Sequence, residues 1–221
     1  MNVLGFDTST AATSAAVLRA DGAVFEHSSP PEDSGGRPGH ARELMPAVAR
    51  VMEEASVAFA ELSLIALSRG PGSFTGLRIA AATARGLAHA HGTPVRGVSS
   101  LAALAQGAGE GLVLALLDAR RGELFAALYE GSAELWAPFA ASPEEVAERA
   151  SELPEAPLAV GDGSLRSRVM LEAAGVRVAP ADSPLHVVRA ASVCRLGAVA
   201  PDSPDATLPL YIREPDARPA R

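Results

Sequence analysis

The stretch Arg69-Gly-Pro-Gly-Ser-Phe-Thr-Gly-Leu-Arg78 joins two segments of opposite character, a predicted strand and a predicted helix. Before it, Leu64-Ile-Ala-Leu-Ser68 is a short apolar run, which predicts a buried strand. After it, residues 74–90 are small and apolar on nearly all sides, which predicts a helix that is buried on more than one side. Glycine and proline form the turn between them, and Ser73 or Thr75 is suited to cap the helix.

The turn itself has two interpretations. The exposed N–H groups at the start of the helix would favour a phosphate or a carboxylate, or else the turn is a structural junction without a ligand. Two common nucleotide motifs are excluded. The sequence contains no lysine, as a Walker-type loop requires, and its glycine spacing does not match the Rossmann fingerprint.

The composition excludes several classes of protein. With 221 residues, 48% hydrophobic and only 4% aromatic, the chain can bury a core of Ala, Leu and Val. A net charge of −7 argues against a broad nucleic-acid-binding surface, so any RNA would be reached through a partner. With a single cysteine, Cys194, the chain cannot form an internal disulfide. We expect Cys194 to be a core residue. No basic leader and no apolar run of membrane-spanning length is seen, so we expect a cytoplasmic protein without a membrane attachment.

The order of the predicted elements indicates an internal duplication. The first strand ends in Asp7 and a second strand follows it, and after the glycine-rich joint at 107–111 a strand ends in Asp118 and is again followed by a strand. The expected strands are 3–6, 14–18, 24–28, 64–68, 95–98, 112–117, 124–129 and 158–160, and the expected helices are 40–55, 74–90, 100–106, 144–150, 166–174 and 185–199. Both halves are therefore expected to be mixed α/β.

We expect two domains and two irregular segments. The domains are an N-terminal lobe at 1–106 and a smaller C-terminal lobe at 107–213. Residues 30–39 are rich in Pro, Gly and acidic side chains, which predicts an exposed mobile loop, and residues 214–221 are predicted to form a flexible tail.

Polar residues that could bind an anion follow the first strand of each half. A carboxylate with neighbouring hydroxyls could meet a hydrated metal ion or the phosphates of a nucleotide, whereas a turn that satisfies its own backbone would need the same residues. The arginines after Asp118 would contact an anion or form a surface ion pair. The candidate anion or nucleotide contacts are Asp7, Thr8, Ser9, Ser73, Thr75, Asp118, Arg120 and Arg121. The histidine spacing supports no metal site, and no nucleophile motif indicates a catalytic residue.

Six segments, in order along the chain, together resemble the TsaB/YeaZ family. They are Asp7-Thr-Ser-Thr10, His40-Ala-Arg-Glu-Leu-Met-Pro46, Gly70-Pro-Gly-Ser-Phe-Thr-Gly-Leu-Arg-Ile79, Gly97-Val-Ser-Ser-Leu101, Asp118-Ala-Arg-Arg-Gly-Glu123 and Pro209-Leu-Tyr-Ile-Arg213. The third and fifth segments are the most specific to that family. The resemblance implies a duplicated actin-like ATPase fold of the ASKHA, ribonuclease H-like type, with two lobes of which the second is smaller.

The resemblance also implies a function in tRNA modification. TsaB is the non-catalytic subunit that acts with TsaD and the ATPase TsaE to place a threonylcarbamoyl group on N6 of the adenosine next to the anticodon, in tRNAs that read codons beginning with A. TsaD would pair with helices of the N-terminal lobe, tRNA would be met through the complex, and the isolated chain could form a homodimer. The candidate partner-binding residues are Leu44, Met45, Val48, Met52, Phe74, Leu77, Arg78, Ala81, Ala84 and Arg85.

The sequence argues against catalysis by this chain. TsaD has two metal-binding histidines in a Val-Asn-His-x-x-x-His stretch, where this chain has Ser100 and Leu104. Its glycine-rich adenosine motif is reduced here to Gly161-Asp-Gly163. We therefore expect no tightly bound cofactor, with ATP, ADP or Mg²⁺ bound only weakly or at a complex interface. The alternative is an independent Mg-ATP-dependent kinase or ATPase that uses Asp7 and Asp118.

Overall fold

A computed structural model of the chain describes residues 1–29 and 39–213. The predicted mobile loop, apart from Gly39, and the predicted flexible tail lie outside the described residues.

The first sheet contains five strands in the order β3-β2-β1-β4-β5. They are β1 (Val3–Asp7), β2 (Thr13–Leu18), β3 (Val24–Ser29), β4 (Leu64–Ser68) and β5 (Val95–Val98). Strands β1, β2 and β3 pair antiparallel, whereas β4 pairs parallel with both β1 and β5. Every residue of β1 and β4 is buried, which is expected of central strands that are covered on both faces.

The second sheet repeats the first. Its order is β10-β9-β6-β7-β8, again with one antiparallel meander and two parallel pairings. The strands are β6 (Leu112–Arg120), β7 (Glu123–Glu130), β8 (Ala133–Ala141), β9 (Leu158–Val160) and β10 (Arg177–Val178). Strand β6 thus occupies the place of β1, and β7 that of β2. The predicted duplication is confirmed, although β8 and β10 were not expected from the sequence.

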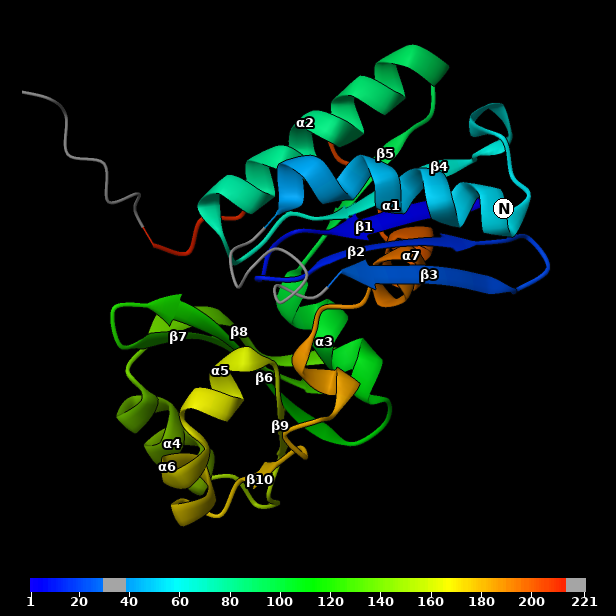
Figure 1. The fold of residues 1–221 in the computed structure, drawn as a ribbon. Helices are drawn as coiled ribbons and strands as arrows, with labels where there is room; N and C mark the ends of the chain where they lie inside the picture. Colours follow the sequence, from blue (N-terminus) through cyan, green and yellow to red (C-terminus); the bar gives the residue numbers. More distant parts are fainter. Residues whose placement is uncertain (30–38, 214–221) are drawn as a thin grey trace, which may run out of the picture.

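The helices also correspond between the two halves (Figure 1). In the first half they are α1 (His40–Ala55), α2 (Phe74–His91) and α3 (Ser100–Ala108); in the second they are α4 (Pro143–Ser151), the pair α5 (Asp162–Arg166) and α6 (Arg168–Ala173), and α7 (Ala190–Val199). Short 3-10 helices occupy Phe59–Glu61 and Pro184–His186. The helix expected at 185–199 therefore begins later, because a 3-10 turn capped by Ser183 precedes it and Val187 is extended.

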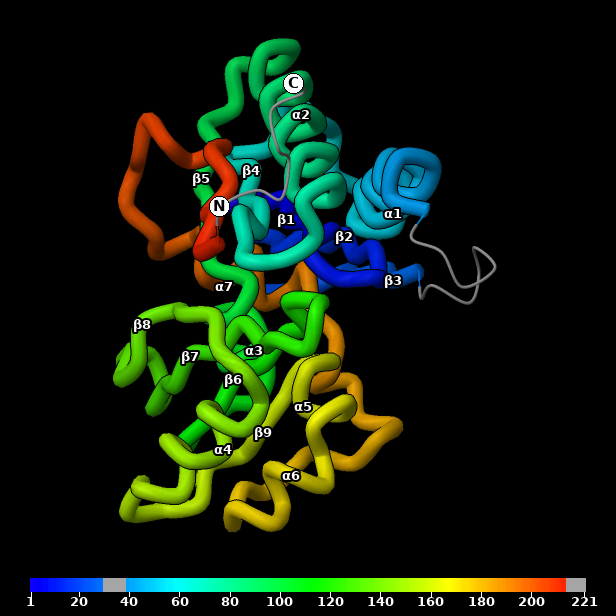
Figure 2. The backbone as a smooth tube through the Cα atoms, turned by 90° about the vertical axis from the view of Figure 1, so that its left-hand side faces the viewer, coloured from blue at the N-terminus to red at the C-terminus, as the bar shows by residue number. Residues whose placement is uncertain are grey.

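Two helices lie between the sheets and join the halves. Helix α7 packs on β1, β2 and β4 of the first sheet, while α3 packs on β6 and β7 of the second sheet and on α7 itself. Figures 1 and 2 show these helices between the two lobes. Cys194 of α7 is fully buried, which confirms it as a core residue, and a Cβ at Gly5 would lie 2.5 Å from its Sγ. The predicted domain boundary at residue 106 falls inside α3.

After α7 the chain returns along the first lobe as an irregular segment with a turn at 204–207, residues 200–213, which we call the C-terminal strap (Figure 2). The N–H of Leu210 donates to the carbonyl of Arg69 at 2.6 Å. A Cβ at Gly97 would lie 2.2 Å from the carbonyl oxygen of Ala206, so glycine lets the strap lie against β5. At its end, Arg213 forms an ion pair with Glu123 of β7. The strap therefore contacts both lobes.

Candidate functional site

The glycine-rich turn after β4 packs directly on the turn between β1 and β2. A Cβ at Gly76 would lie 1.8 Å from the carbonyl oxygen of Thr8, and one at Gly72 would lie 2.3 Å from that of Ser9. The Thr8 hydroxyl donates to the Gly76 carbonyl at 2.8 Å, and the N–H of Ser73 donates to the Ser9 carbonyl at 2.7 Å. Ser73 caps α2 by accepting from the N–H of Gly76, as predicted. These glycines thus bring two backbone segments together.

Asp7 lies at the end of β1 and is only 1% exposed. Its Oδ2 accepts a hydrogen bond from the N–H of Ser9 at 3.1 Å. Burial raises the pKa of Asp7 to about 6, although hydrogen bonding to Ser9 acts in the opposite direction. Within the described residues, Oδ1 of Asp7 and the hydroxyl oxygens of Ser9 and Thr10 are buried without a hydrogen-bond partner. The turn between β1 and β2 therefore forms hydrogen bonds with only some of its own buried polar groups.

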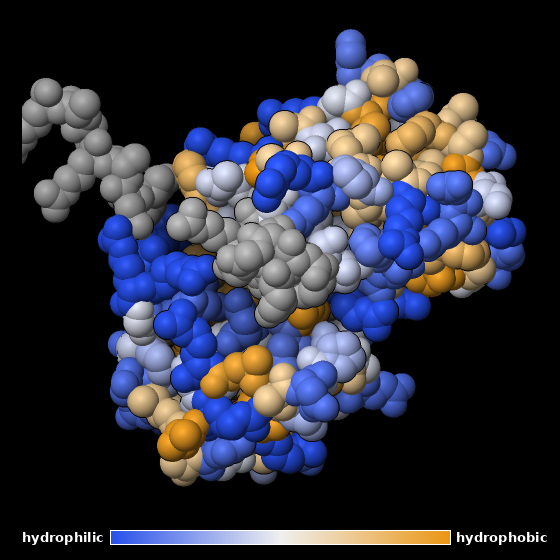
Figure 3. Space-filling view, viewed as in Figure 1, coloured by the Kyte–Doolittle hydropathy of each residue, from blue (hydrophilic) through white to orange (hydrophobic). Residues whose placement is uncertain are grey.

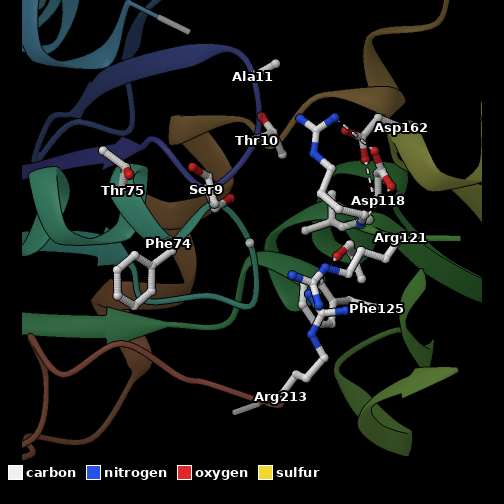
Figure 4. A pocket seen from close by; sticks show the side chains of 15 residues that line it. Ser9, Thr10, Ala11, Phe74, Thr75, Asp118, Arg121, Phe125, Asp162 and Arg213 are labelled. Atoms are coloured by element: carbon white, nitrogen blue, oxygen red, sulfur yellow. Dashed lines mark hydrogen bonds and ion pairs between the residues drawn. The ribbon is translucent and has the colours of Figure 1, made fainter. Parts of the chain in front are cut away.

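A cleft of about 310 Å³ separates the two lobes beside this turn (Figure 4). It is lined from the first lobe by Ser9, Thr10, Ala11, Gly72, Ser73, Phe74 and Thr75, from the second by Leu117, Asp118, Ala119, Arg120, Arg121, Phe125 and Asp162, and from the strap by Arg213. Six of the eight predicted anion contacts line this cleft. Asp7 and Thr8 are buried and do not. Arg213, which also lines the cleft, was not among the predicted anion contacts. It ends the Pro209-Leu-Tyr-Ile-Arg213 segment, and the sequence did not indicate that this segment reaches the cleft.

The hairpin between β6 and β7 supplies the basic side of the cleft. Its two-residue turn, Arg121-Gly122, and the preceding Arg120 all have positive φ, at 56°, 82° and 65°. For arginine this backbone conformation costs on the order of 1 kcal/mol per residue. The Asp118 carboxylate lies 3.3 Å from Nη1 of Arg120 and 2.5 Å from Nη1 of Arg166. Arg120 therefore forms the ion pair that was one of its two predicted roles.

Asp162 lies behind this hairpin at the start of α5. Its Oδ1 accepts a hydrogen bond from the N–H of Asp118 at 3.0 Å. Burial raises the pKa of Asp162, while that hydrogen bond opposes the shift. Both carboxylates that line the cleft are thus engaged with protein donors.

Most of the predicted partner-binding residues on α1 and α2 are buried, which corrects that prediction. Leu44, Val48, Met52, Leu77, Ala81 and Ala84 are buried within the first lobe. Their stripe is wide because α1 and α2 cover the outer face of the first sheet. Met45 and Phe74 are 44% and 40% exposed, and Arg78 and Arg85 are also exposed. Only these four predicted residues reach the surface that the two helices present.

The strap continues this exposed surface beside α2. The Phe74 and Tyr211 rings lie 5.6 Å apart, and the Arg78 guanidinium lies 3.7 Å from the centroid of the Phe74 ring. Arg85 donates to the hydroxyl of Thr207 at 2.7 Å. Figure 3 shows pale and orange side chains gathered over the first lobe, where α1 and α2 lie. We call the exposed side chains of α1, α2 and the adjoining strap the α1–α2 face.

Residues 1–29 and 39–213 contain neither a metal-binding cluster nor a membrane-spanning helix. No group of three or more His, Cys, Asp or Glu side chains there could hold a metal ion. None of the helices in that part of the chain combines the length and the apolar character needed to cross a membrane.

Comparison with known proteins relates this geometry to a family. The family model described as "TsaD: tRNA N6-adenosine threonylcarbamoyltransferase" matches residues 34–157. The chain is 38% identical over 136 residues to the tRNA threonylcarbamoyladenosine biosynthesis protein TsaB of Escherichia coli, covering 59% of this chain and 55% of that protein. It is 35% identical over 132 residues to TsaB of Bacillus subtilis, covering 59% and 56%. The matches thus span about half the length of these curated relatives.

A solved structure matches over nearly the whole chain. YeaZ from Pseudomonas aeruginosa superposes with a TM-score of 0.77 and 30% sequence identity, covering 95% of this chain and 99% of that one. This match confirms the predicted two-lobed α/β fold. The chain belongs to the TsaB/YeaZ family.

Proposed function

We propose that this chain is the non-catalytic subunit that TsaD and TsaE require to transfer a threonylcarbamoyl group to N6 of the adenosine next to the anticodon, in tRNAs that read codons beginning with A. The similarity to YeaZ over both lobes carries this proposal. The names of the bacterial relatives support the assignment to this biosynthesis. With a net charge of −7, the chain would meet tRNA through the complex.

The absence of catalysis is supported by the residues at the position of the TsaD metal site. Ser100 and Leu104 are both buried, and a leucine side chain cannot ligate a metal. The kinase alternative would use Asp7 and Asp118, but Asp7 is buried and does not line the cleft, and Asp118 pairs with Arg120 and Arg166. These observations favour an accessory subunit over a kinase or ATPase.

The α1–α2 face is our proposed docking surface for the TsaD-type partner. Its exposed positions include small residues, such as Ala49 of α1 and Ala82 and Gly86 of α2, which allow another helix to approach closely. Phe74 and Met45 provide apolar contacts at one end. In the isolated chain, the same face is available to a second copy.

Reconstitution tests the proposed function directly. Purified TsaD and TsaE, together with TsaC, the protein that supplies the threonylcarbamoyl group as an adenylate, are incubated with tRNA, threonine, bicarbonate and ATP, with or without this chain. Threonylcarbamoyladenosine is then quantified by mass spectrometry. We expect the modified nucleoside only when the chain is present. Equal modification without it would overturn the proposal.

A matched pair of variants tests the docking surface. Ala82→Glu places a charge on the exposed side of α2, whereas Ala173→Glu places one on the exposed side of α6. Ala81 is unsuitable because it is buried, so a charge there would unfold the lobe. We expect Ala82→Glu to weaken binding to TsaD at least tenfold, as measured by gel filtration and calorimetry, with an unchanged circular dichroism spectrum. Binding that is equal in the two variants would place the interface elsewhere.

A further inference from the structure

The C-terminal strap is attached to the first lobe along most of its length. Arg96 of β5 donates to Asp202 at 2.8 Å, and Arg85 of α2 donates to the hydroxyl of Thr207 at 2.7 Å. Between these two links, Ala206 is only 6% exposed because it lies against β5. The position of the strap is therefore set by α2 and β5.

The last residue of the strap is attached to the second lobe. Nη1 of Arg213 pairs with Glu123 at the start of β7, and Nη2 of Arg213 donates to the carbonyl of Ala119 at 3.3 Å. Both partners belong to the β6–β7 hairpin, which lines the cleft. Figure 4 shows the Arg213 side chain extending from the strap toward that side of the cleft. The strap thus links α2 on the surface of the first lobe to the hairpin at the cleft.

The attachment of the strap is of a kind that can open while both lobes stay folded. Residues 200–213 belong to neither sheet, and the side chains of Leu208 and Tyr211 are 47% and 42% exposed. Exposed polar links contribute little individually, and a segment with few buried contacts opens locally at a low cost in free energy. A strap attached to the hairpin and a strap released from it are therefore two states of one folded chain.

We propose that the strap couples the α1–α2 face to the cleft. The attached and released states differ at both places. Attachment holds the β6–β7 hairpin to the first lobe through Arg213, and it keeps the Tyr211 ring beside that of Phe74, with 5.6 Å between the ring centroids. The same segment therefore determines the shape of the α1–α2 face and the position of one wall of the cleft.

This coupling acts in both directions. A protein that covers Phe74 and Tyr211 together favours the attached state, because release of the strap moves Tyr211 away from that protein. By linkage, attachment at the hairpin in turn favours binding at the α1–α2 face. The identity of the binding protein rests on the function proposed above, whereas the coupling is a property of the isolated chain.

Hydrogen exchange followed by mass spectrometry on the isolated full chain tests the coupling. Because no partner is added, failure of the proposed docking surface would leave this result unaffected. Thr207→Val removes the acceptor that holds the strap to Arg85 of α2. We expect the amides of residues 119–124 in the hairpin to exchange faster in this variant, by about threefold or more. Thr207→Ser keeps the hydroxyl and should exchange like the parent.

The reverse experiment loosens the strap at the hairpin. Glu123→Gln removes the charge that pairs with Arg213. We expect the amides of residues 203–210 in the strap to exchange faster in this variant, again by about threefold or more. Glu130→Gln is the matched charge control, because Glu130 is exposed at the opposite end of β7, and it should leave exchange in the strap unchanged.

The two experiments together decide the proposal. Faster exchange at the distant segment in both Thr207→Val and Glu123→Gln, with melting temperatures equal to that of the parent, is the expected result. Exchange that changes only beside each substitution would show that the two ends of the strap move independently, and would overturn the coupling.

Discussion

The two lobes have the same strand order but differ at the hairpin formed by their first two strands. In the first lobe, residues 8–12 separate β1 from β2 and pack against the start of α2. In the second, Arg121-Gly122 closes the β6–β7 hairpin directly. Glycine makes the close contact in both lobes, Gly76 against Thr8 and Gly161 against Leu116, whose carbonyl oxygen would lie 2.0 Å from a Cβ. The close backbone contact after the fourth strand is therefore kept in both lobes, while the hairpin differs.

The charges of the two hairpins differ as well. Asp7 is buried with few partners, whereas Asp118 is bound by two arginines at the cleft. The long α2 of the first lobe has 18 residues, but its counterparts α5 and α6 have 5 and 6. The first lobe therefore offers the extended helical surface, and the second offers the cations of the cleft.

The largest expected effect comes from filling the glycine contact of the first lobe. Gly76→Val should destabilise the chain by about 3 kcal/mol or more, because the carbonyl of Thr8 is backbone and cannot move aside easily. Urea denaturation measures the loss. Gly86→Ala is the control on the same helix, where a Cβ meets nothing within 4 Å, and it should stabilise by about 0.5–1 kcal/mol. A Gly76→Val variant as stable as the parent would show that this contact is not rigid.

Removing the buried charge of Asp7 is expected to have the next largest effect. Burial raises the pKa of Asp7 from its ordinary value of 3.8 to about 6, so the folded state binds more protons than the unfolded state between these pH values. The destabilisation is absent below pH 4, grows as the pH rises, and is complete above pH 6. Asp7→Asn should therefore stabilise by about 2–3 kcal/mol at pH 8 and have little effect at pH 4.

The corresponding change in the second lobe should have the opposite sign. Asp118→Asn removes ion pairs with Arg120 and Arg166, and should destabilise by up to about 1 kcal/mol at pH 8. Urea denaturation at several pH values measures both variants. If Asp7→Asn is less stable than the parent at pH 8, the first-lobe carboxylate is stabilised as an anion and the contrast between the lobes is lost.

The smallest expected effect concerns helix caps in the two lobes. Ser73 accepts from the N–H of Gly76, and Ser142 accepts from that of Glu145 at the start of α4. Replacing either serine by alanine should cost about 1 kcal/mol in urea denaturation. Asp at either position keeps an acceptor and should restore most of the loss. A large effect of Ser73→Ala with none of Ser142→Ala would show that the first cap has a role beyond helix stability.

Much of the fold could be predicted because the residues that form it are close in sequence. The apolar run of β4, the cap of α2 and the repeated aspartate near the end of the first strand of each half are local patterns. Strand β8 was missed because it contains Pro138 and has little buried apolar surface, as an edge strand can. The face of α2 was misassigned because periodicity identifies an apolar stripe without identifying what covers it.

Local sequence patterns were enough to predict most of the strands and helices, their repetition in two halves, and the positions of the glycine turn and its cap. Packing of the two halves, in contrast, places α7 on the first sheet and α3 on the second, buries Asp7 while Asp118 contacts arginines, and brings Arg213 of the strap to the cleft. The physical reason is the range of the interactions. Turns and caps depend on neighbouring residues, whereas burial and ion pairing depend on segments that meet only when the two halves pack together.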